Sequence, residues 1–165
     1  MPRKKNHSLS SFLGATAAVV TTAVAGSVAT DPKTAWYKSL DKPRWQPPPA
    51  VFPVAWTALY TSIALVSGKV LADTKAEGDD ERHRDYKAAL VLNLILNAGW
   101  SFAFFKAKKL GLASIVAGAL AASSADLSKR AGQQDPKLGL ALKPYSAWTS
   151  FATALSTDIW RRNRD

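Results

Sequence analysis

The chain has 165 residues and a formal net charge of +10, from 22 basic and 12 acidic residues. Such a charge suits a nucleic-acid binder, but here the charges lie in the termini and in short segments between long apolar stretches. We therefore expect no nucleic-acid partner. Cysteine is absent, which excludes a disulfide framework, a thiolate nucleophile and a thiolate metal ligand.

Five apolar segments follow in chain order, and each is a candidate membrane helix. Three of them contain no Asp, Glu, Lys or Arg and are about 18 residues long, the lower limit for spanning a hydrocarbon core of about 30 Å. The fourth is shorter and also uncharged, and the fifth contains one charged residue, Asp158. None alternates in polarity with period two, as strands of a barrel would. The sequence therefore predicts an all-α integral membrane protein, a bundle of five transmembrane helices.

Charged and proline-rich segments separate these helices. The predicted order is a basic tail (1–11), helix 12–29, a Trp/Pro-rich loop (30–50), helix 53–72, a charged linker (73–87), helix 88–105, helix 110–125, a polar loop (126–137), helix 144–160 and a basic carboxyl tail (161–165). A single membrane domain covers 12–160. Pro53 and Pro144 suit the first turn of a helix, where a missing N–H costs little.

Two features concern the topology. Arg3, Lys4 and Lys5 precede an apolar run that contains an A-x-A pattern ending at Ala25, so a cleaved signal peptide leaving four helices is an alternative to a retained first helix. The apolar run continues to Ala29, which favours the retained helix. The Lys and Arg residues divide equally between the two sides and give no absolute orientation. Five spans place the 30–50 loop and the carboxyl terminus on one side, opposite the amino terminus.

A motif dense in Trp and Pro occupies residues 36–60. It has the form W-Y-x-x-L-x-K-P-x-W-x-P-P followed by F-x-x-x-W-x-x-L-Y. The third predicted helix carries N-x-x-W-x-x-x-F-F, and the fifth carries Pro144, Tyr145, Trp148, Phe151, Ala152 and Trp160. The chain resembles the TspO/MBR family, which includes the tryptophan-rich sensory protein, the translocator protein and the peripheral benzodiazepine receptor. This resemblance covers nearly everything after the amino-terminal tail.

The tryptophans divide into two groups by position. Trp160 abuts two arginines and suits an aromatic belt at the membrane interface. Trp56, Trp100 and Trp148 each lie several residues inside a helix, where an indole N–H needs a partner from another helix or from a ligand. Core packing is the alternative for each one singly. Three together favour a pocket.

The resemblance implies a cavity inside the bundle, covered by the first loop, that binds porphyrins, sterols and benzodiazepine-type drugs. A flat apolar ligand suits aromatic walls with a few polar groups that fix its orientation. The matching positions are Trp36, Trp45, Pro47 and Pro48 for the lid, and Trp56, Asn97, Trp100, Trp148 and Ala152 for the wall. Tyr37, Tyr60 and Tyr145 carry hydroxyls that could donate to a propionate or carbonyl of such a ligand. No cofactor is required, and protoporphyrin IX or haem is the expected ligand. The family also implies a homodimer.

Three functions remain open at this point. The first is a receptor or transporter that binds tetrapyrroles for scavenging, sensing or transport. The second is a light-dependent porphyrin-degrading photo-oxidase, for which Trp56 and Trp148 occupy the implicated positions in bacterial members. The third is a lipid or sterol carrier. Metal ligation of a tetrapyrrole is disfavoured because His7 and His83 fall in charged segments and Met1 is the only methionine.

Some positions depart from the family pattern. The segment 155–161 lacks the tyrosine expected before Trp160, which argues against animal-type cholesterol recognition. Leu112 stands where animal members carry a tryptophan. Asp158 is expected to reach the interface or to pair with a neighbouring arginine. Small residues spaced by four, Gly99 with Ala103 and Gly118 with Ala122, permit close helix packing, either between two copies or within one bundle.

Overall fold

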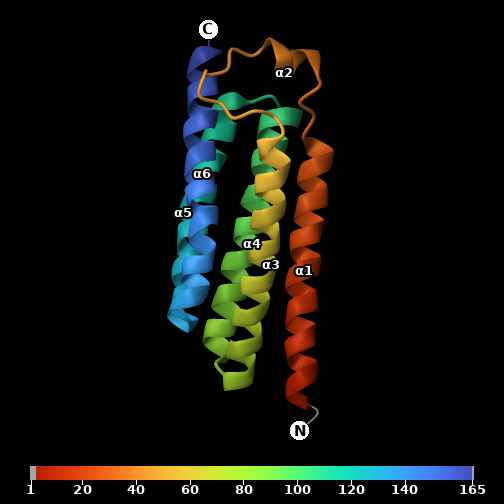
Figure 1. Cartoon of the computed structure of the whole chain (residues 1–165), viewed down its shortest axis with the longest axis vertical. Helices are drawn as coiled ribbons and strands as arrows, with labels where there is room; N and C mark the ends of the chain where they lie inside the picture. Colours follow the sequence, from red (N-terminus) through yellow and green to blue (C-terminus); the bar gives the residue numbers. More distant parts are fainter. Residues whose placement is uncertain (1–2, 165) are drawn as a thin grey trace.

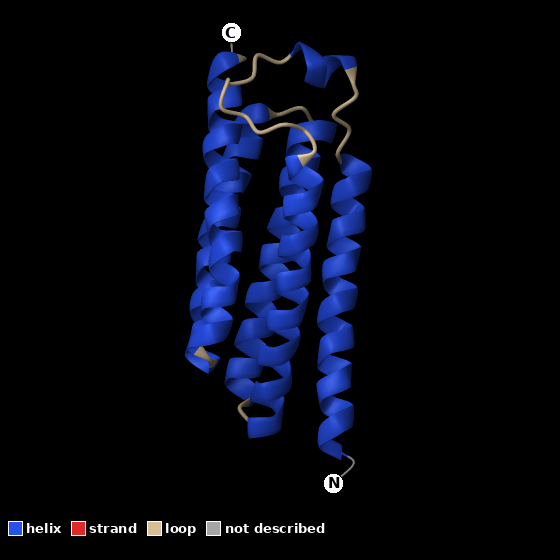
Figure 2. Cartoon of the chain, in the orientation of Figure 1, coloured by secondary structure: helices blue, strands red, loops and turns tan. Residues whose placement is uncertain are grey.

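The computed structural model describes residues 3–164 and arranges them as long helices running side by side (Figure 1). The described residues form helices and connecting turns, without a strand (Figure 2). The elements are α1 (Arg3–Ala29), α2 (Ala35–Ser39), α3 (Val51–Glu77), α4 (Asp80–Ser101), the π-helical turn η1 (Phe102–Lys106), α5 (Leu110–Gln134) and α6 (Pro136–Arg162). The predicted all-α class is thus confirmed.

Four of the described helical segments are long and apolar enough to cross a membrane. They are Ser8–Ala29, Val51–Glu77, Asp80–Lys106 and Leu110–Gln134. The chain is therefore an integral membrane protein. Helix α6 is also long, at 27 residues, but it carries more polar residues and is not one of these four.

The helices pack as neighbouring pairs that share one core. Helix α6 lies along α5, α1 lies along α3, and α4 contacts both α5 and α1 (Figure 1). Apolar side chains of α3, α5 and α6 are fully buried between them, including Ile63, Val70, Leu127 and Leu142. Large apolar side chains such as Leu65 and Ile95 point outward, as expected for surfaces that face lipid.

The turns at the amino-terminal end of the bundle have local causes. Gly78 ends α3 in the left-handed conformation, with φ of 73°, which glycine adopts without steric cost. The Asp79 carboxylate then accepts a hydrogen bond from the Arg82 N–H and caps α4. Asp135 caps α6 in the same way, and Pro136 occupies its first turn.

The helices are longer than the sequence predicts, and three predicted non-helical segments are wrong. The tail 1–11 is helical from Arg3. The linker 73–87 is helical except near Gly78, and the loop 126–137 is helical up to Gln134. Charged residues mark the end of an apolar span, but a helix can continue past them. Their side chains reach the headgroup region while the helix backbone remains hydrogen-bonded.

The start of α6 also differs from the prediction. Pro144 lies inside α6, which begins at Pro136 because Asp135 supplies the cap. The carboxyl end is helical to Arg162, so the predicted tail 161–165 is wrong at its start.

The small residues Gly99 and Gly118 face neighbouring helices of the same bundle. A Cβ at Gly99 would lie 4.0 Å from Val116, and one at Gly118 would lie 3.8 Å from Thr153. Neither glycine is needed for a backbone contact closer than ordinary van der Waals distance within this bundle.

Residues 30–50, here called the lid segment, cross one end of the bundle. They contain the short helix α2 and lie beside the carboxyl end of α6, while the amino terminus lies at the other end (Figure 1). The lid segment and the carboxyl terminus thus lie at one end of the bundle, opposite the amino terminus, which is the arrangement that five spans require.

Candidate functional site

Three tryptophans from three helices meet beneath the lid segment. Trp56 on α3 lies between Trp100 on α4 and Trp148 on α6, with ring centroids 6.3 Å from each. The Trp56 and Trp148 rings are perpendicular, an edge-to-face arrangement that favours aromatic pairs. The structure thus brings together the three tryptophans that the sequence places inside helices.

Two tyrosines extend this cluster toward the centre of the bundle. Tyr60 stacks on Trp56 at 5.4 Å, because the two are one turn apart on α3. Tyr145 meets Trp56 edge-on at 6.5 Å and is fully buried. Phe52, which the sequence analysis did not assign to the site, packs edge-on against Trp148 at 5.8 Å.

A chain of hydrogen bonds runs below the aromatic rings. The Tyr60 hydroxyl donates to Asn97 Oδ1 at 2.8 Å, and Asn97 Nδ2 donates to the Tyr145 hydroxyl at 3.1 Å. Tyr145 in turn donates to Asn93 Oδ1 at 2.8 Å, and Asn93 Nδ2 reaches Ser124 Oγ at 3.2 Å. Each of these buried polar side chains thereby has a partner, as an apolar surrounding demands.

Asn97 was predicted from the sequence as a site residue, and Asn93 was not. The signal was available, because the two asparagines are four residues apart and share one face of α4. Two amides within an apolar span also indicate partners inside the bundle.

Two indole N–H groups of the cluster differ in whether they have a hydrogen-bond acceptor. Trp100 Nε1 donates to Ser156 Oγ on α6 at 3.0 Å. Trp148 Nε1 is buried and has no acceptor among the described residues. An unpaired buried N–H is costly, so this donor is available to an acceptor on a ligand. Ser156 was missed by the sequence analysis, because no pattern singles out one serine of α6.

The lid segment rests on aromatic side chains that the π-helical turn presents. Trp36 meets Phe104 edge-on at 6.1 Å, and Tyr37 lies 5.5 Å from Phe105. The Lys42 ammonium lies 4.6 Å from the centroid of the Tyr37 ring. The phenylalanines belong to the recognised N-x-x-W-x-x-x-F-F motif, but their role as a seat for the lid segment was not predicted.

The second half of the lid segment is tied to α6. The Trp45 ring meets Phe151 edge-on at 5.7 Å, and its Nε1 donates to Asp158 Oδ2 at 3.1 Å. Asp158 also accepts from Arg162 Nε at 3.1 Å. The predicted pairing of Asp158 with a neighbouring arginine is confirmed, while its bond to Trp45 was missed because 113 residues separate the two.

The remaining predicted residues lie nearby. Pro47 is half-buried and Pro48 exposed, and the Pro48 carbonyl accepts from the Val51 N–H at 3.0 Å where α3 begins. Ala152 is buried on α6, one turn after Trp148.

The histidines occupy helices and not the predicted charged loops. His7 lies within α1. His83 lies in the first turn of α4, where its Nδ1 is 3.1 Å from Thr74 Oγ1 and from the Leu71 carbonyl, at the end of the bundle away from the lid segment. No group of three potential metal ligands occurs among the described residues.

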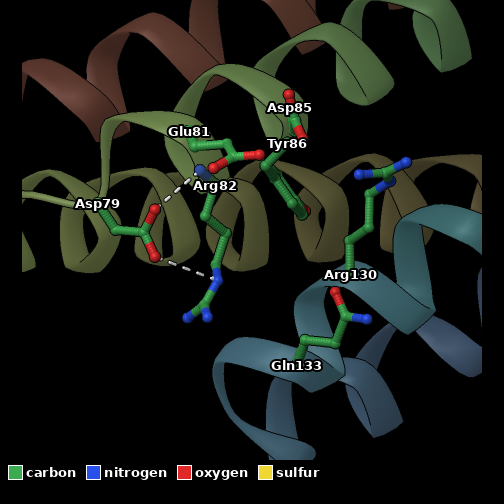
Figure 3. A pocket seen from close by; sticks show the side chains of 7 residues that line it. All are labelled: Asp79, Glu81, Arg82, Asp85, Tyr86, Arg130 and Gln133. Atoms are coloured by element: carbon green, nitrogen blue, oxygen red, sulfur yellow. Dashed lines mark hydrogen bonds and ion pairs between the residues drawn. The ribbon is translucent and has the colours of Figure 1, made fainter.

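A polar cleft of about 250 Å³ opens at the amino-terminal end of the bundle (Figure 3). Its lining is mostly charged or polar: Asp79, Glu81, Arg82, Asp85, Tyr86, Arg130 and Gln133. Arg82 is held there by Asp79 and by Gln134, to which it donates at 3.1 Å. This lining does not suit a flat apolar ligand, so the aromatic cluster beneath the lid segment remains the candidate site.

Comparison with known proteins gives the family. The model of the TspO/MBR family matches residues 15–161. The chain is 33% identical over 128 residues to the tryptophan-rich sensory protein of Cereibacter sphaeroides, covering 78% of this chain and 77% of that one. It is 33% identical over 132 residues to the human translocator protein, covering 78% and 75%, and 34% identical over 146 residues to the tryptophan-rich protein TspO of Chlorobaculum tepidum, covering 84% and 87%. The chain therefore belongs to the TspO/MBR family.

Proposed function

We propose that this membrane protein binds tetrapyrroles such as protoporphyrin IX or haem, and related flat apolar ligands, between the lid segment and helices α3, α4 and α6. Its role is porphyrin scavenging, sensing or transport. The observation that carries the proposal is the meeting of Trp56, Trp100 and Trp148 beneath a lid that is itself aromatic. Aromatic faces stack on a macrocycle, and three helices supply them from different directions.

Polar groups in the site match the edge of such a ligand. The unpaired Trp148 indole N–H can donate to a propionate or carbonyl oxygen. Tyr60 and Asn97 can exchange their mutual hydrogen bond for one to the ligand. Lys42 and Lys108, which lie over the Tyr37 and Trp36 rings, supply positive charge at the mouth. A dianionic porphyrin thus finds apolar walls and a basic rim.

The rings of the cluster and the lid segment contact one another directly, so a ligand has to separate them. We propose that binding displaces the lid segment and turns the Trp56 and Trp148 rings outward to stack on the macrocycle. Stacking of these rings on the porphyrin then replaces their edge-to-face contact with one another.

Titration of the purified protein in detergent with protoporphyrin IX tests the proposal. In the dark, saturable quenching of tryptophan fluorescence with one porphyrin per chain is expected. The Trp100→Ala variant should weaken binding, while Phe102→Ala, which removes an exposed aromatic side chain of η1, serves as the control. Quenching that does not saturate, or that both variants reduce equally, would argue against this site. Preferential binding of a sterol would favour the lipid or sterol carrier.

A second candidate function is light-dependent porphyrin degradation. The contact between Trp56 and Trp148, with centroids 6.3 Å apart, favours it. A photosensitised porphyrin held between two indoles has two oxidisable side chains within contact distance. The protein would then act as a photo-oxidase, with the porphyrin itself supplying the photochemistry.

We also propose that α6 spans the membrane as the fifth helix. Its 27 residues extend about 40 Å, and it packs along the whole of the apolar helix α5. The chain has no cysteine, so single cysteines introduced at Gly78 and at Arg164 can be labelled from either side of intact vesicles. Labelling from opposite sides supports five spans, and labelling from one side contradicts them.

The homodimer implied by the family is a further proposal. The mass of the purified protein in detergent, measured by light scattering, is expected to be that of two chains. A mass of one chain would contradict the homodimer.

A further inference from the structure

A hollow runs along the outer side of the hairpin formed by α5 and α6, at the end away from the lid segment. Its volume is about 560 Å³, and small or apolar residues dominate its lining: Ala125, Ser128, Lys129, Gly132, Pro136, Gly139, Leu140, Lys143 and Ser146. The two helices touch here through glycine. A Cβ at Gly139 would lie 2.6 Å from the Gly132 Cα. The missing side chains leave a groove between the helix surfaces.

If α6 spans the membrane, as proposed above, the groove lies at the level of the lipid headgroups. Along α6, Lys143 is about 26 Å from the interfacial Trp160, and along α5, Lys129 is about 28 Å from Leu110 at the other end. These lengths approach the ~30 Å thickness of a hydrocarbon core. Both lysines are exposed and line the groove, one from each helix. They therefore stand where lipid phosphates lie, on the membrane face opposite the lid segment.

The charge of these lysines is uncompensated by acidic side chains. Neither Lys129 nor Lys143 takes part in an ion pair of residues 3–164, whereas the adjacent Arg130 pairs with Asp126 at 2.7 Å. The groove thus presents two free ammonium groups above an apolar floor. This combination complements an anionic headgroup attached to an acyl chain.

A third polar group lies deeper in the groove. Ser146 Oγ is buried and has no hydrogen-bond partner among the described residues. It is one turn further into the membrane than Lys143, a depth difference of about 4.5 Å. In a diacyl phospholipid the ester carbonyls lie below the phosphate by a similar distance. A hydroxyl at this depth can donate to an ester carbonyl, which a detergent ether or a free phosphate lacks at that position.

We propose that this groove binds one anionic phospholipid. The phosphate lies between Lys129 and Lys143, an ester carbonyl accepts from Ser146 Oγ, and an acyl chain lies along Ala125. A second copy of the hairpin is the other possible occupant. Symmetric packing of two such grooves would bring the lysines of each copy toward those of the other, and like charges repel. The observations therefore favour lipid.

The experiment measures lipid selectivity with the full chain in nanodiscs. Spin-labelled phosphatidylglycerol and phosphatidylcholine are compared by electron paramagnetic resonance, which gives their relative association with the protein. The wild type should prefer phosphatidylglycerol at least threefold. The Lys129→Gln/Lys143→Gln variant should lower this preference to near one. Ser146→Ala should weaken the retention of both lipids about equally, because both carry the ester.

The matched control is Lys75→Gln/Lys87→Gln, which removes the same charge from α3 and α4 at the same end of the bundle. Its preference should equal that of the wild type. Equal loss in both double variants would overturn the proposal in favour of a general surface charge, and no loss in either would also overturn it. Efficient disulfide crosslinking of a Leu140→Cys variant in every lipid would show a second copy in the groove instead. Porphyrin binding is measured separately, and its failure leaves this test unaffected.

Discussion

Trp45 Nε1 in the lid segment donates a hydrogen bond of 3.1 Å to Asp158 near the end of α6. A second link lies beside it. The Asp41 N–H donates to Asn163 Oδ1 and Asn163 Nδ2 donates to the Asp41 carbonyl, both at 2.9 Å. Arg162 approaches the Asp41 carboxylate at 3.7 Å. The lid segment is therefore fastened to the carboxyl end of α6. Only some of the side chains that make these contacts belong to the recognised Trp/Pro-rich motif.

Removal of the Asp158 carboxylate should loosen this fastening. Asp158→Ala loses the acceptor for Trp45 and the partner of Arg162, whereas Asp158→Asn keeps an oxygen acceptor. Because these groups are partly exposed, each bond contributes about 0.5–1.5 kcal/mol. Hydrogen exchange of residues 40–50 should become roughly twofold to tenfold faster in Asp158→Ala and change less in Asp158→Asn. Equal exchange in all three proteins would contradict this role for Asp158.

Porphyrin affinity should depend on the lid tryptophans. The Trp36→Ala/Trp45→Ala variant removes the edge-to-face packing of the lid segment on Phe104 and Phe151. Binding of protoporphyrin IX, measured by fluorescence quenching in the dark, should weaken by about 1–3 kcal/mol for each stacking interaction that is removed. Unchanged affinity would show that these two indoles serve as an interface belt.

Binding and photochemistry should separate in the Trp56→Phe and Trp148→Phe variants. Phenylalanine keeps most of the aromatic face but is far less oxidisable than indole. If the protein is a photo-oxidase, both variants should bind porphyrin in the dark and lose the spectral change under light and oxygen. A wild type that causes no loss of porphyrin absorbance beyond that in empty detergent would eliminate the enzyme function and leave binding or transport.

Replacement of Asn97 should destabilise the bundle from inside. Asn97→Ala removes the acceptor of Tyr60 and the donor to Tyr145, and interhelical hydrogen bonds in membranes contribute about 0.6 kcal/mol each on average. A loss of about 1–2 kcal/mol is expected, because the Tyr60 hydroxyl is also left without this partner. Unfolding in mixed micelles measures it. Ser62→Ala, which removes one exposed bond to the Ala141 carbonyl, should cost less, and the reverse order would contradict the buried chain of hydrogen bonds.

The α5–α6 contact predicts a contrast between two glycines. A Cβ at Gly139 would meet Gly132 Cα at 2.6 Å and the Ser128 carbonyl at 2.9 Å, whereas a Cβ at Gly132 would have its nearest contact at 3.6 Å. Backbone cannot move aside as a flexible side chain does, so Gly139→Ala should cost about 1–3 kcal/mol. Gly132→Ala should be nearly neutral in the same unfolding assay. Similar costs for both would refute this packing.

The helical class and the general path of the chain were predictable because the apolar segments are long and their charges are segregated. The helix ends were not, since hydropathy marks the part of a helix inside the hydrocarbon. Helix α5 continues beyond the apolar span to Gln134 because Leu127 and Ala131 extend its buried face. Hydrogen bonding, and not charge, decides where such a helix ends.

The aromatic cluster was predictable in part. Indoles deep in apolar spans need partners, which points to Trp56, Trp100 and Trp148 without any knowledge of the fold. Their polar partners Asn93 and Ser156 depend on how each helix is rotated about its axis, which a single sequence does not specify.

The link between Asp41 and Asn163 also orders events during biosynthesis. These two residues are 122 positions apart, so the helices between them must be made and inserted before the link can form. The lid segment leaves the ribosome early, together with the first helices, yet its partner on α6 is among the last described residues to emerge. Closure of the lid segment over the candidate site is therefore expected only after α6 has been made and inserted, and nascent chains halted before α6, which also lack Trp148, should not retain porphyrin.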